Sequence, residues 1–362
     1  MRVAEAPATR EELGAALAAA AEAGTRVRFR GAGTKRGWSR PAPPEALELS
    51  TAGLNTVVEH NAGDLTAVLE PGVRLADAQA TFAKAGQMLA LDPPDAAATV
   101  GGIVATADTG PLRARYGGPR DLVVGMRVLL SDGTLAKSGG KVIKNVAGYD
   151  IAKLFTGSFG TLGAIVELSL RLHPLPPETS TALGGSADAD ELARGAAALG
   201  ESPLEHHGLD IRWDAGRGMV LARFAGAAPR PQAEAAEVLL RREGLSTEIH
   251  DDDEPLWDEQ RAAQRGPLVV KVSGLPTRLP ALVRAADELG ASLVGRAALG
   301  ISWLRFAEPS AAAVERLRRD WIAVVQDRPA ELDVDPWGEL DPAALALMQR
   351  VKERFDPAGV CV

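Results

Sequence analysis

Alternating and helical runs of apolar residues divide the first half of the chain into short elements. Thr9 and Glu12 form a capping box before an Ala-rich run that ends at Gly24, which predicts an opening helix. The alternating residues 26–30 (RVRFR) predict a strand that runs into the glycine loop GAGTKRG. A helix is predicted at about residues 75–85, and further strands in ALELS, TVVEH, LTAVLEPG, DLVVGMRVLL and AIVELSLRLHP.

A proline-rich break at residues 174–177 marks a change from Gly/Val-rich strands to amphipathic segments rich in Ala, Glu and Arg. Beyond it, helix patterns in PQAEAAEVLLRREG, LPALVRAADELG and PSAAAVERLRRDW alternate with strand patterns in LDIRWD, GMVLARFAG, PLVVKVSG and SLVGRAALGISWLRF. The fold class is therefore predicted as α+β. The tail predicts a helix from Asp341 and a short extended end that packs on the first domain. The predicted domains are residues 1–175, 176–335 and 336–362.

Composition narrows the class of protein. The 362 residues carry a net charge of −8, which argues against general attraction to nucleic acid. No run of about 18 uncharged apolar residues is present to span a bilayer, and the opening MRVAEAPATREEL lacks a secretion signal, so we expect a cytoplasmic protein. The single cysteine, Cys361, argues against a disulfide framework or an iron–sulfur site. If electrons leave through iron–sulfur clusters, another chain must hold them.

The loop GAGTKRG at residues 31–37 follows a strand and invites comparison with nucleotide-binding loops. Arg36 stands where the dinucleotide fingerprint needs a glycine, and the Walker spacing is also absent. A loop of small residues can nevertheless cradle a pyrophosphate with consecutive backbone N–H groups, helped here by Thr34 and Lys35. A plain glycine turn is the alternative.

Two further glycine-rich stretches lie in the same predicted domain. Residues 98–110 (ATVGGIVATADTG) place adjacent glycines among small apolar residues, which permits close approach to a flat ligand or simply tight packing. Residues 157–163 alternate glycines with Ser158 and Thr161, a pattern typical of a phosphate or ring edge rather than a core strand. The short helix DIAKLF before them is predicted to have Asp150 as its N-cap and to bury Leu154 and Phe155. Three such loops together favour an elongated dinucleotide.

Four motifs carry a family resemblance: RFRGAGTK, EPGVRL, ATVGGIVATADTGPLRARYGGPRDLVVGMRVLLSDG and GGKVIKNVAGYDIAKLFTGSFGTLGAIVELSLRLHP. With them the chain resembles the FAD-binding E subunits of bacterial glycolate oxidases, within the flavoproteins similar to vanillyl-alcohol oxidase. The resemblance covers residues 1–175 well, the middle loosely and the tail through RFDPAGV. It implies a two-subdomain p-cresol methylhydroxylase-type FAD-binding domain, an α+β cap over the flavin, and a tail returning to the FAD domain.

The resemblance also implies which residues bind FAD. Residues 31–35 match the loop around the pyrophosphate, 99–102 match a second wall, and 144–149 with 160–165 match segments along the flavin and adenine. The implied cofactor-binding residues are Arg30, Gly31, Ala32, Gly33, Thr34, Lys35, Pro71, Gly72, Thr99, Val100, Gly101, Gly102, Lys144, Asn145, Val146, Ala147, Gly148, Tyr149, Gly160, Thr161, Gly163 and Ile165.

The chain departs from catalytic relatives in its histidines and cysteines. Residues 31–40 contain neither, so we expect non-covalent FAD. Relatives that oxidise 2-hydroxy acids carry histidine-rich motifs, whereas the adjacent His206 and His207 would point to opposite faces of a strand. We interpret this pair as a surface or domain contact, and HDDDE at residues 250–254 as a solvated turn. No metal site is expected, and no catalytic residue can be named.

Arginines in the strand-like stretches of the middle domain raise a further alternative. Arg212, Arg296 and Arg305 could face a substrate carboxylate, but ordinary surface pairs are the simpler interpretation.

The resemblance implies a role in oxidising glycolate to glyoxylate within a complex. The expected partners are a second FAD subunit that carries the hydroxy-acid site and an iron–sulfur subunit, with contact to the inner face of the cell membrane only through them. No nucleic acid and no integral membrane segment is expected. Two alternatives stay open: a stand-alone FAD-linked 2-hydroxy acid dehydrogenase, and a flavin-free assembly subunit.

Overall fold

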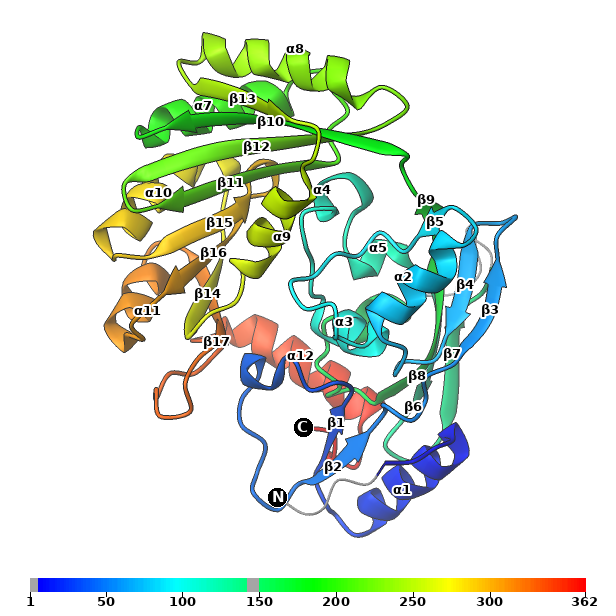
Figure 1. Cartoon of the computed structure of the whole chain (residues 1–362). Helices are drawn as coiled ribbons and strands as arrows, with labels where there is room; N and C mark the ends of the chain where they lie inside the picture. The colour runs from blue at the N-terminus through cyan, green and yellow to red at the C-terminus, as the bar shows by residue number, and fades with distance from the viewer. Residues whose placement is uncertain (1–5, 142–149) are drawn as a thin grey trace.

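The computed structural model describes residues 6–141 and 150–362 and shows two lobes joined by a C-terminal segment (Figure 1). The N-terminal lobe begins with α1 (Arg10–Glu22), whose N-cap Thr9 accepts a hydrogen bond from Glu12 N at 3.1 Å, as predicted. Helix α1 packs beside a parallel pair of strands, β1 (Val27–Arg30) and β2 (Leu47–Ser50). The chain between these strands carries the glycine loop and one 3₁₀ turn, η1 (Arg36–Trp38).

A five-stranded antiparallel sheet forms the second part of this lobe. Its strand order is β3 (Val57–Asn61), β4 (Thr66–Leu69), β8 (Ala164–Arg171), β6 (Val123–Leu129) and β7 (Leu135–Gly139). The buried core on this sheet includes Phe82, Ile103 and Leu168. The remaining elements of the lobe are α2 (Leu75–Ala83), α3 (Val100–Thr106), α4 (Arg113–Tyr116), α5 (Pro119–Leu122), α6 (Ala152–Phe155) and the pair β5 (Gln87–Met88) and β9 (His173–Pro174).

Two local predictions in this lobe are wrong. The glycine-rich stretch after Thr99 is not a loop: residues 100–106 form α3, because the Thr99 hydroxyl accepts from Gly102 N and caps the helix. In α6, Ile151 rather than Asp150 is the N-cap, and Leu154 is 47% exposed while Phe155 is buried. Adjacent side chains of a helix point about 100° apart, and in this short helix only Phe155 of the two points into the core.

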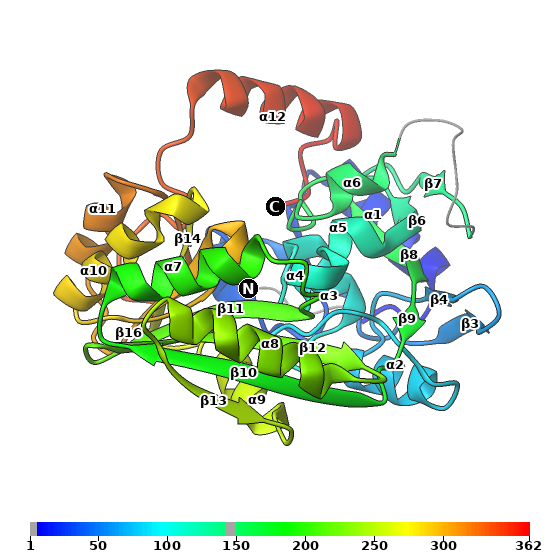
Figure 2. The ribbon, with the colours of Figure 1, turned by 90° about the horizontal axis from the view of Figure 1, so that it is seen from above.

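The second lobe is built on one eight-stranded antiparallel sheet, and we call it the eight-stranded lobe. Its strand order is β13 (Ser246–His250), β10 (Glu178–Ser186), β12 (Arg217–Gly226), β11 (Gly208–Asp214), β15 (Ser292–Arg296), β16 (Ile301–Phe306), β14 (Leu268–Ser273) and β17 (Ile322–Asp327). Figures 1 and 2 show α7 (Ala189–Gly200), α8 (Pro229–Arg242), α10 (Leu279–Glu288) and α11 (Ala311–Arg318) on its outer face. Short 3₁₀ turns lie at η2 (Pro276–Arg278) and η3 (Ala297–Leu299).

The two faces of this sheet differ in chemistry. The outer face is apolar, since side chains such as Val270, Val272 and Leu304 form one core with the four helices. The inner face is polar and carries α9 (Glu254–Ala262), whose Trp257 donates to Thr181 Oγ1 at 2.9 Å. This polar face is turned toward the N-terminal lobe (Figure 1).

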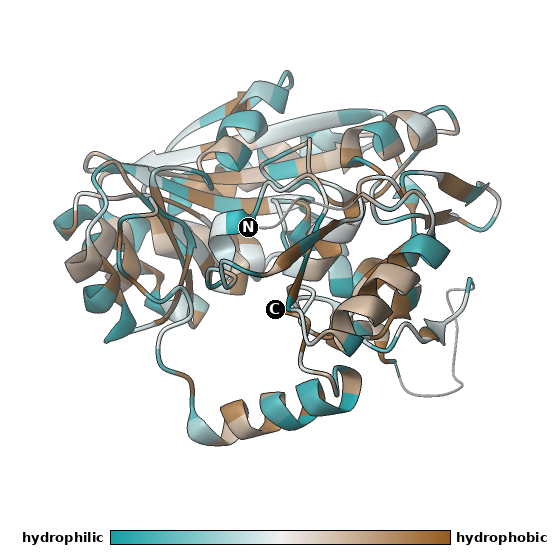
Figure 3. Ribbon diagram, turned by 90° about the horizontal axis from the view of Figure 1, so that it is seen from below, coloured by the Kyte–Doolittle hydropathy of each residue, from teal (hydrophilic) through white to brown (hydrophobic). Residues whose placement is uncertain are grey.

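The C-terminal segment crosses from the eight-stranded lobe back to the N-terminal lobe. Helix α12 (Pro342–Phe355) lies on the outside of the molecule, with no buried residue and with polar and apolar side chains intermixed (Figures 2 and 3). After it, the chain runs parallel to β1: Val27 N donates to Val360 O at 2.7 Å and Val362 N donates to Val27 O at 2.9 Å. The predicted return of the tail is therefore confirmed. Within the described ranges, no helix is both long and apolar enough to cross a membrane.

Replacing Asp356 should destabilise the packing of the C-terminal segment on the N-terminal lobe. Its buried carboxylate accepts from Val360 N at 3.2 Å and Cys361 N at 2.9 Å and pairs with Lys352. We expect Asp356→Ala to lower the free energy of unfolding by about 3 kcal/mol, because two buried N–H groups lose their acceptor. Urea unfolding of this variant and of Glu353→Ala, at an exposed position of α12, measures the effect. Equal stability of the two variants would show that the Asp356 carboxylate does not stabilise the C-terminal segment.

Candidate functional site

A cleft opens in the N-terminal lobe between the loop after β1, helix α3 and the loop before β8. It has a volume of about 860 Å³ including its open mouth. Its lining comes from Arg28–Arg36, Ser39, Glu48, Thr51, Pro71, Thr99, Gly101, Gly102, Ala105, Thr106, Phe159, Gly160, Gly163, Ala164 and Ile165. Segments more than a hundred residues apart in the chain thus share one cavity.

The loop at residues 31–35 lines this cleft. In the part of the chain that the structure describes, none of its five backbone amides donates to a protein acceptor. Consecutive free amides in a turn make a concave site for an anion. By contrast, the first N–H groups of α3 are already used, since Val100 N bonds Val73 O, Gly101 N bonds Pro71 O and Gly102 N bonds Thr99 Oγ1. Residues 31–35, not the α3 N-terminus, therefore hold the unused donors.

Glycine is required where the two walls meet. A Cβ on Gly31 would lie 2.1 Å from Thr99 Oγ1, and one on Gly101 would lie 2.4 Å from Pro71 Cβ. Only residues without side chains allow this approach. The predicted wall at residues 99–102 is thus a packing surface behind the loop at residues 31–35.

Cations surround the mouth of the cleft. Arg30 Nε lies 2.8 Å from Glu48 Oε1, and Arg36 pairs with the other oxygen of this buried carboxylate. The Arg28 guanidinium donates to Arg36 O and Ser39 Oγ, both at 2.9 Å, and burial and then the charge of Arg36 lower its pKa. Arg30 and Arg36 share one carboxylate and Arg28 has none, so the mouth keeps a positive charge.

A buried ion pair closes the inner end. Lys35 Nζ lies 3.1 Å from Asp108 Oδ2, and both side chains are almost inaccessible to solvent. Burial raises the pKa of Asp108, and the Lys35 charge opposes this shift. The sequence predicts that Lys35 helps to hold a phosphate, but its ammonium group is directed to Asp108 instead.

The part of the cleft beside the loop at residues 157–163 is apolar. Phe159, Ala105 and Ile165 line it. Phe159 adopts a left-handed φ of 56° and meets Trp337, from the C-terminal segment, edge to face at a centroid distance of 4.8 Å. A charged mouth and an apolar interior in one cavity suit a ligand with a diphosphate and aromatic rings.

The structure brings most of the predicted cofactor residues to this cleft, but not all. Those lining it are Arg30, Gly31, Ala32, Gly33, Thr34, Lys35, Pro71, Thr99, Gly101, Gly102, Gly160, Gly163 and Ile165. Val100 points into the core, Gly72 packs on the backbone of residues 51–54, and Thr161 bonds Ser158 O, so these three do not line it. Lys144, Asn145, Val146, Ala147, Gly148 and Tyr149 lie outside the described residues.

Sequence reasoning missed several residues of the cleft. Arg28 alternates with Arg30 in RVRFR, so strand periodicity alone could have placed it on the same face. Glu48 carries no signal in the sequence, because only the folded chain shows that its carboxylate is buried among cations. The same is true of Asp108, which does not line the cleft but is buried against Lys35.

A second polar network joins the two lobes. Arg296 is fully buried: it donates to Asp210 at 2.7 Å, to Gln264 at 3.0 Å and to Gly110 O in the N-terminal lobe at 3.0 Å. The interpretation of Arg296 as a surface residue is therefore wrong. Burial raises the pKa of its partner Asp210, an effect that the charge of Arg296 opposes.

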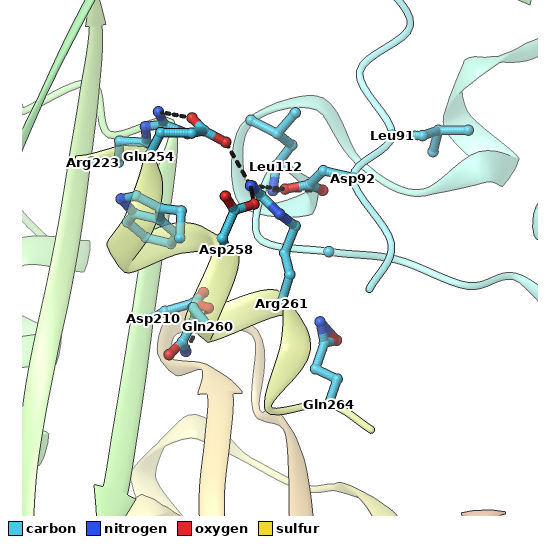
Figure 4. A network of polar contacts seen from close by, with 12 residues as sticks. Leu91, Asp92, Leu112, Asp210, Arg223, Glu254, Asp258, Gln260, Arg261 and Gln264 are labelled. Carbon is cyan, nitrogen blue, oxygen red and sulfur yellow. Dashed lines mark hydrogen bonds and ion pairs between the residues drawn. The ribbon is translucent and has the colours of Figure 1, made fainter. Parts of the chain in front are cut away.

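The helix α9 extends this network. Figure 4 shows Arg261 between Asp92 of the N-terminal lobe, 4.0 Å away, and the carboxylates of Glu254 and Asp258. The predicted solvated turn at residues 250–254 is also wrong in one position, since Asp253 is buried and accepts from Thr179, Thr181 and Arg223.

The histidines lie elsewhere. His207 Nδ1 is 3.2 Å from the Tyr116 hydroxyl where the lobes meet, and burial followed by the charge of Arg115 lowers its pKa to about 4. His207 thus contacts the N-terminal lobe through Tyr116, in line with a domain contact at this position. Across the described ranges, no three His, Cys, Asp or Glu side chains gather as a metal site.

Comparison with known proteins gives the ligand its identity. Residues 2–139 match the family described as FAD binding domain. The chain is 35% identical to glycolate oxidase subunit GlcE of Escherichia coli over 150 residues (41% of this chain, 42% of that protein) and 33% identical to glycolate oxidase subunit GlcD of Bacillus subtilis over 191 residues (52% and 40%). It is also 35% identical to an uncharacterised FAD-linked oxidoreductase of Mycobacterium tuberculosis over 187 residues (51% and 40%). Each match spans about two fifths of the relative's length.

The fold of the whole chain is similar to that of alkyldihydroxyacetonephosphate synthase, with a TM-score of 0.73 at 15% identity over 99% of this chain and 76% of that one. The chain therefore carries a p-cresol methylhydroxylase-type FAD-binding domain, and its cofactor is FAD. The cleft fits this group, because it offers free amides and arginines for a diphosphate and an apolar interior for rings.

Removing the charge of Lys35 should lower the free energy of unfolding of the protein. Lys35→Met leaves the Asp108 carboxylate buried without its partner, and we expect unfolding to become easier by about 3–5 kcal/mol. Adding Asp108→Leu should recover most of that loss. Urea unfolding gives both values, with the exposed Lys141→Met variant as control, expected within about 1 kcal/mol of the parent. A cost for Lys35→Met no larger than the control's would rule out the buried pair.

Asp92 predicts a pH dependence of stability. Burial raises its pKa to about 7, and Arg296, Arg261 and the amide of Leu112 only partly oppose this. Between pH 4 and 7 the folded protein then binds a proton at Asp92 that the unfolded chain releases, so stability falls as pH rises through this range. The loss attributable to Asp92 is on the order of 3 kcal/mol.

Asp92→Asn should remove this part of the slope, because an amide does not titrate and still accepts from Leu112 N. Denaturant unfolding at pH 4.5, 6 and 7.5 measures the slope. The exposed Asp214→Asn serves as control and should keep the parental slope. An Asp92→Asn variant with the parental slope would show that Asp92 is ionised throughout.

Proposed function

We propose that this chain is the FAD-binding subunit of a glycolate oxidase (dehydrogenase) complex that converts glycolate to glyoxylate. The observation that carries the proposal is the cleft with five unused backbone amides at residues 31–35 beside an apolar interior. The similarity to two proteins named as glycolate oxidase subunits supports the substrate. In this proposal residues 1–175 bind FAD, residues 176–335 form a cap and residues 336–362 return to the FAD domain.

The residues of the cleft have distinct tasks in this function. The amides of residues 31–35 bind the diphosphate, and Arg30 and Arg36 neutralise its charge while Glu48 orients them. Ala105, Phe159 and Ile165 exclude water from the rings. Bound FAD supplies an acceptor for the two electrons and the hydrogen that leave the hydroxyl-bearing carbon of a 2-hydroxy acid. No His or Cys belongs to the described lining, which supports non-covalent attachment.

Two groups that the reaction needs are assigned to partner subunits because the cleft of this chain does not supply them. Oxidation of a 2-hydroxy acid needs a base for the hydroxyl proton, and none of the five histidines lines the cleft. The single cysteine, Cys361, is buried against β1, and burial followed by the charge of Asp356 raises its pKa to about 12. We therefore assign the histidine site to a second flavin subunit and electron exit to an iron–sulfur subunit, with the complex inside the cell.

The visible spectrum of the purified chain, read anaerobically with and without glycolate, tests this function. We expect the chain alone to be yellow and unresponsive, and the flavin to bleach when the chain is co-purified with its two partners. Bleaching of the chain alone would establish a stand-alone 2-hydroxy acid dehydrogenase. A folded, colourless chain that ignores added FAD would establish an assembly subunit instead.

A further inference from the structure

The glycine loop after β1 has a hollow on each side. Gly33, Thr34 and Arg36 line the cleft, and the same three residues line an open hollow between the lobes, with a volume of about 1510 Å³ including open solvent. Arg265 and Asp327 of the eight-stranded lobe line this hollow but not the cleft. A stretch of backbone between two hollows is not shaped by a packed core behind it. Its conformation therefore depends on the hydrogen bonds that its own polar groups make.

The eight-stranded lobe supplies donors for the carbonyl groups of this loop. Thr34 O accepts from Arg265 Nη2 at 3.1 Å, and Gly37 O accepts from Arg328 Nη1 at 3.1 Å. By contrast, the amides of residues 31–35 donate to no protein acceptor within the described ranges. The carbonyl groups of the loop are thus held from the opposite lobe, whereas its amides are left for a ligand.

Arg265 is itself held in place by Asp327 at the end of β17. Arg265 Nε donates to Asp327 Oδ2 at 2.6 Å, and Gly266 N lies 3.4 Å from the same oxygen. The other oxygen, Oδ1, accepts from Nε1 of the buried Trp38 at 3.0 Å. Trp38 belongs to η1, which directly follows the glycine loop. One carboxylate therefore fixes both the end of the loop and the arginine that holds its middle.

The contact at Thr34 O has a consequence for the next amide. In a trans peptide the carbonyl oxygen and the following N–H group lie in one plane and point in opposite directions. Because Arg265 holds Thr34 O on the side of the hollow, the N–H group of Lys35 points away from Arg265. Arg265 thus sets the direction of a donor in the loop.

The charge of Arg265 is already offset inside the protein. Its guanidinium pairs with Asp327 and lies 4.0 Å from Asp95. Because Arg265 also does not line the cleft, its effect on a ligand there must pass through the loop.

We propose that Arg265 is a positioning residue for FAD: from the eight-stranded lobe it holds Thr34 O and so orients the loop amides that bind the diphosphate. The inference rests on the proposed role of residues 31–35 in binding this group. It makes the eight-stranded lobe a part of the cofactor site and not only a cap.

The affinity of the purified full chain for FAD tests the inference. Titration of the FAD-free chain, followed by the change in flavin fluorescence, gives the dissociation constant without any turnover. We expect Arg265→Met to weaken FAD binding at least about tenfold, because the loop loses a charge-assisted hydrogen bond that holds its shape. The matched control is Arg241→Met, on the outer helix α8, where Arg241 likewise pairs with a carboxylate. It should bind FAD as the parent does.

Competition by ADP and by adenosine separates positioning from a general loss of structure. The two compounds differ only in the diphosphate, and each is measured by its displacement of FAD. The parent should prefer ADP, and Arg265→Met should narrow this preference several-fold, because the misplaced amides face the diphosphate. Partial unfolding would instead lower both affinities by the same factor and leave the preference unchanged.

Thermal unfolding checks that each variant is folded, and Arg265→Gln, which keeps a donor for Asp327, replaces Arg265→Met if that variant is not. The inference is overturned if the Arg265 variant binds FAD as Arg241→Met does or keeps the parental preference for ADP. A parent that does not prefer ADP to adenosine also overturns it, because residues 31–35 would then not bind the diphosphate. Failure of the complex to oxidise glycolate, while FAD binding still depends on Arg265, would refute the proposed function alone.

Discussion

The buried guanidinium of Arg296 is the interaction on which the arrangement of this molecule depends. It is fully withdrawn from water at the junction of the lobes and satisfies its donors with Asp210, Gln264 and Gly110 O. A guanidinium so buried tolerates no loss of a partner, because an unpaired charge in that environment costs several kcal/mol. The lobes are therefore held in one relative position, and the inner face of the sheet is fixed over the end of the cleft.

The cleft contains two different electrostatic environments. At the mouth, Arg30 and Arg36 share Glu48, and the amides of residues 31–35 donate to no protein acceptor in the described chain. Beside the cleft, Lys35 is neutralised by Asp108, and both side chains are almost inaccessible to solvent. The free amides and the arginines suit the diphosphate of the cofactor, whereas the charge of Lys35 is already paired inside the protein.

The C-terminal segment has a mechanical role in this arrangement. It leaves the eight-stranded lobe, passes Trp337 against Phe159 at the cleft and then pairs with β1, the strand that leads into the anion-binding loop. Asp356 and Lys352 hold the turn at the end of α12, and Lys352 also donates to Thr161 O of the loop before β8. The tail thus braces both loops that form the cleft.

The sequence by itself determined the α+β class and the return of the tail, and it predicted the class of ligand and its binding loops. These follow from local signals: glycine loops after strands, period-two alternation and helix caps act within a few neighbouring residues. It did not determine that residues 100–106 form a helix, that Leu154 is exposed, or that Arg296 and Asp253 are buried. Those outcomes depend on which distant segments meet, since burial and pairing of charge are properties of the packed lobes. Tertiary structure alone decided that Lys35 is paired with Asp108 and that Arg296 is paired with Asp210, because each pair joins residues that are far apart in the sequence.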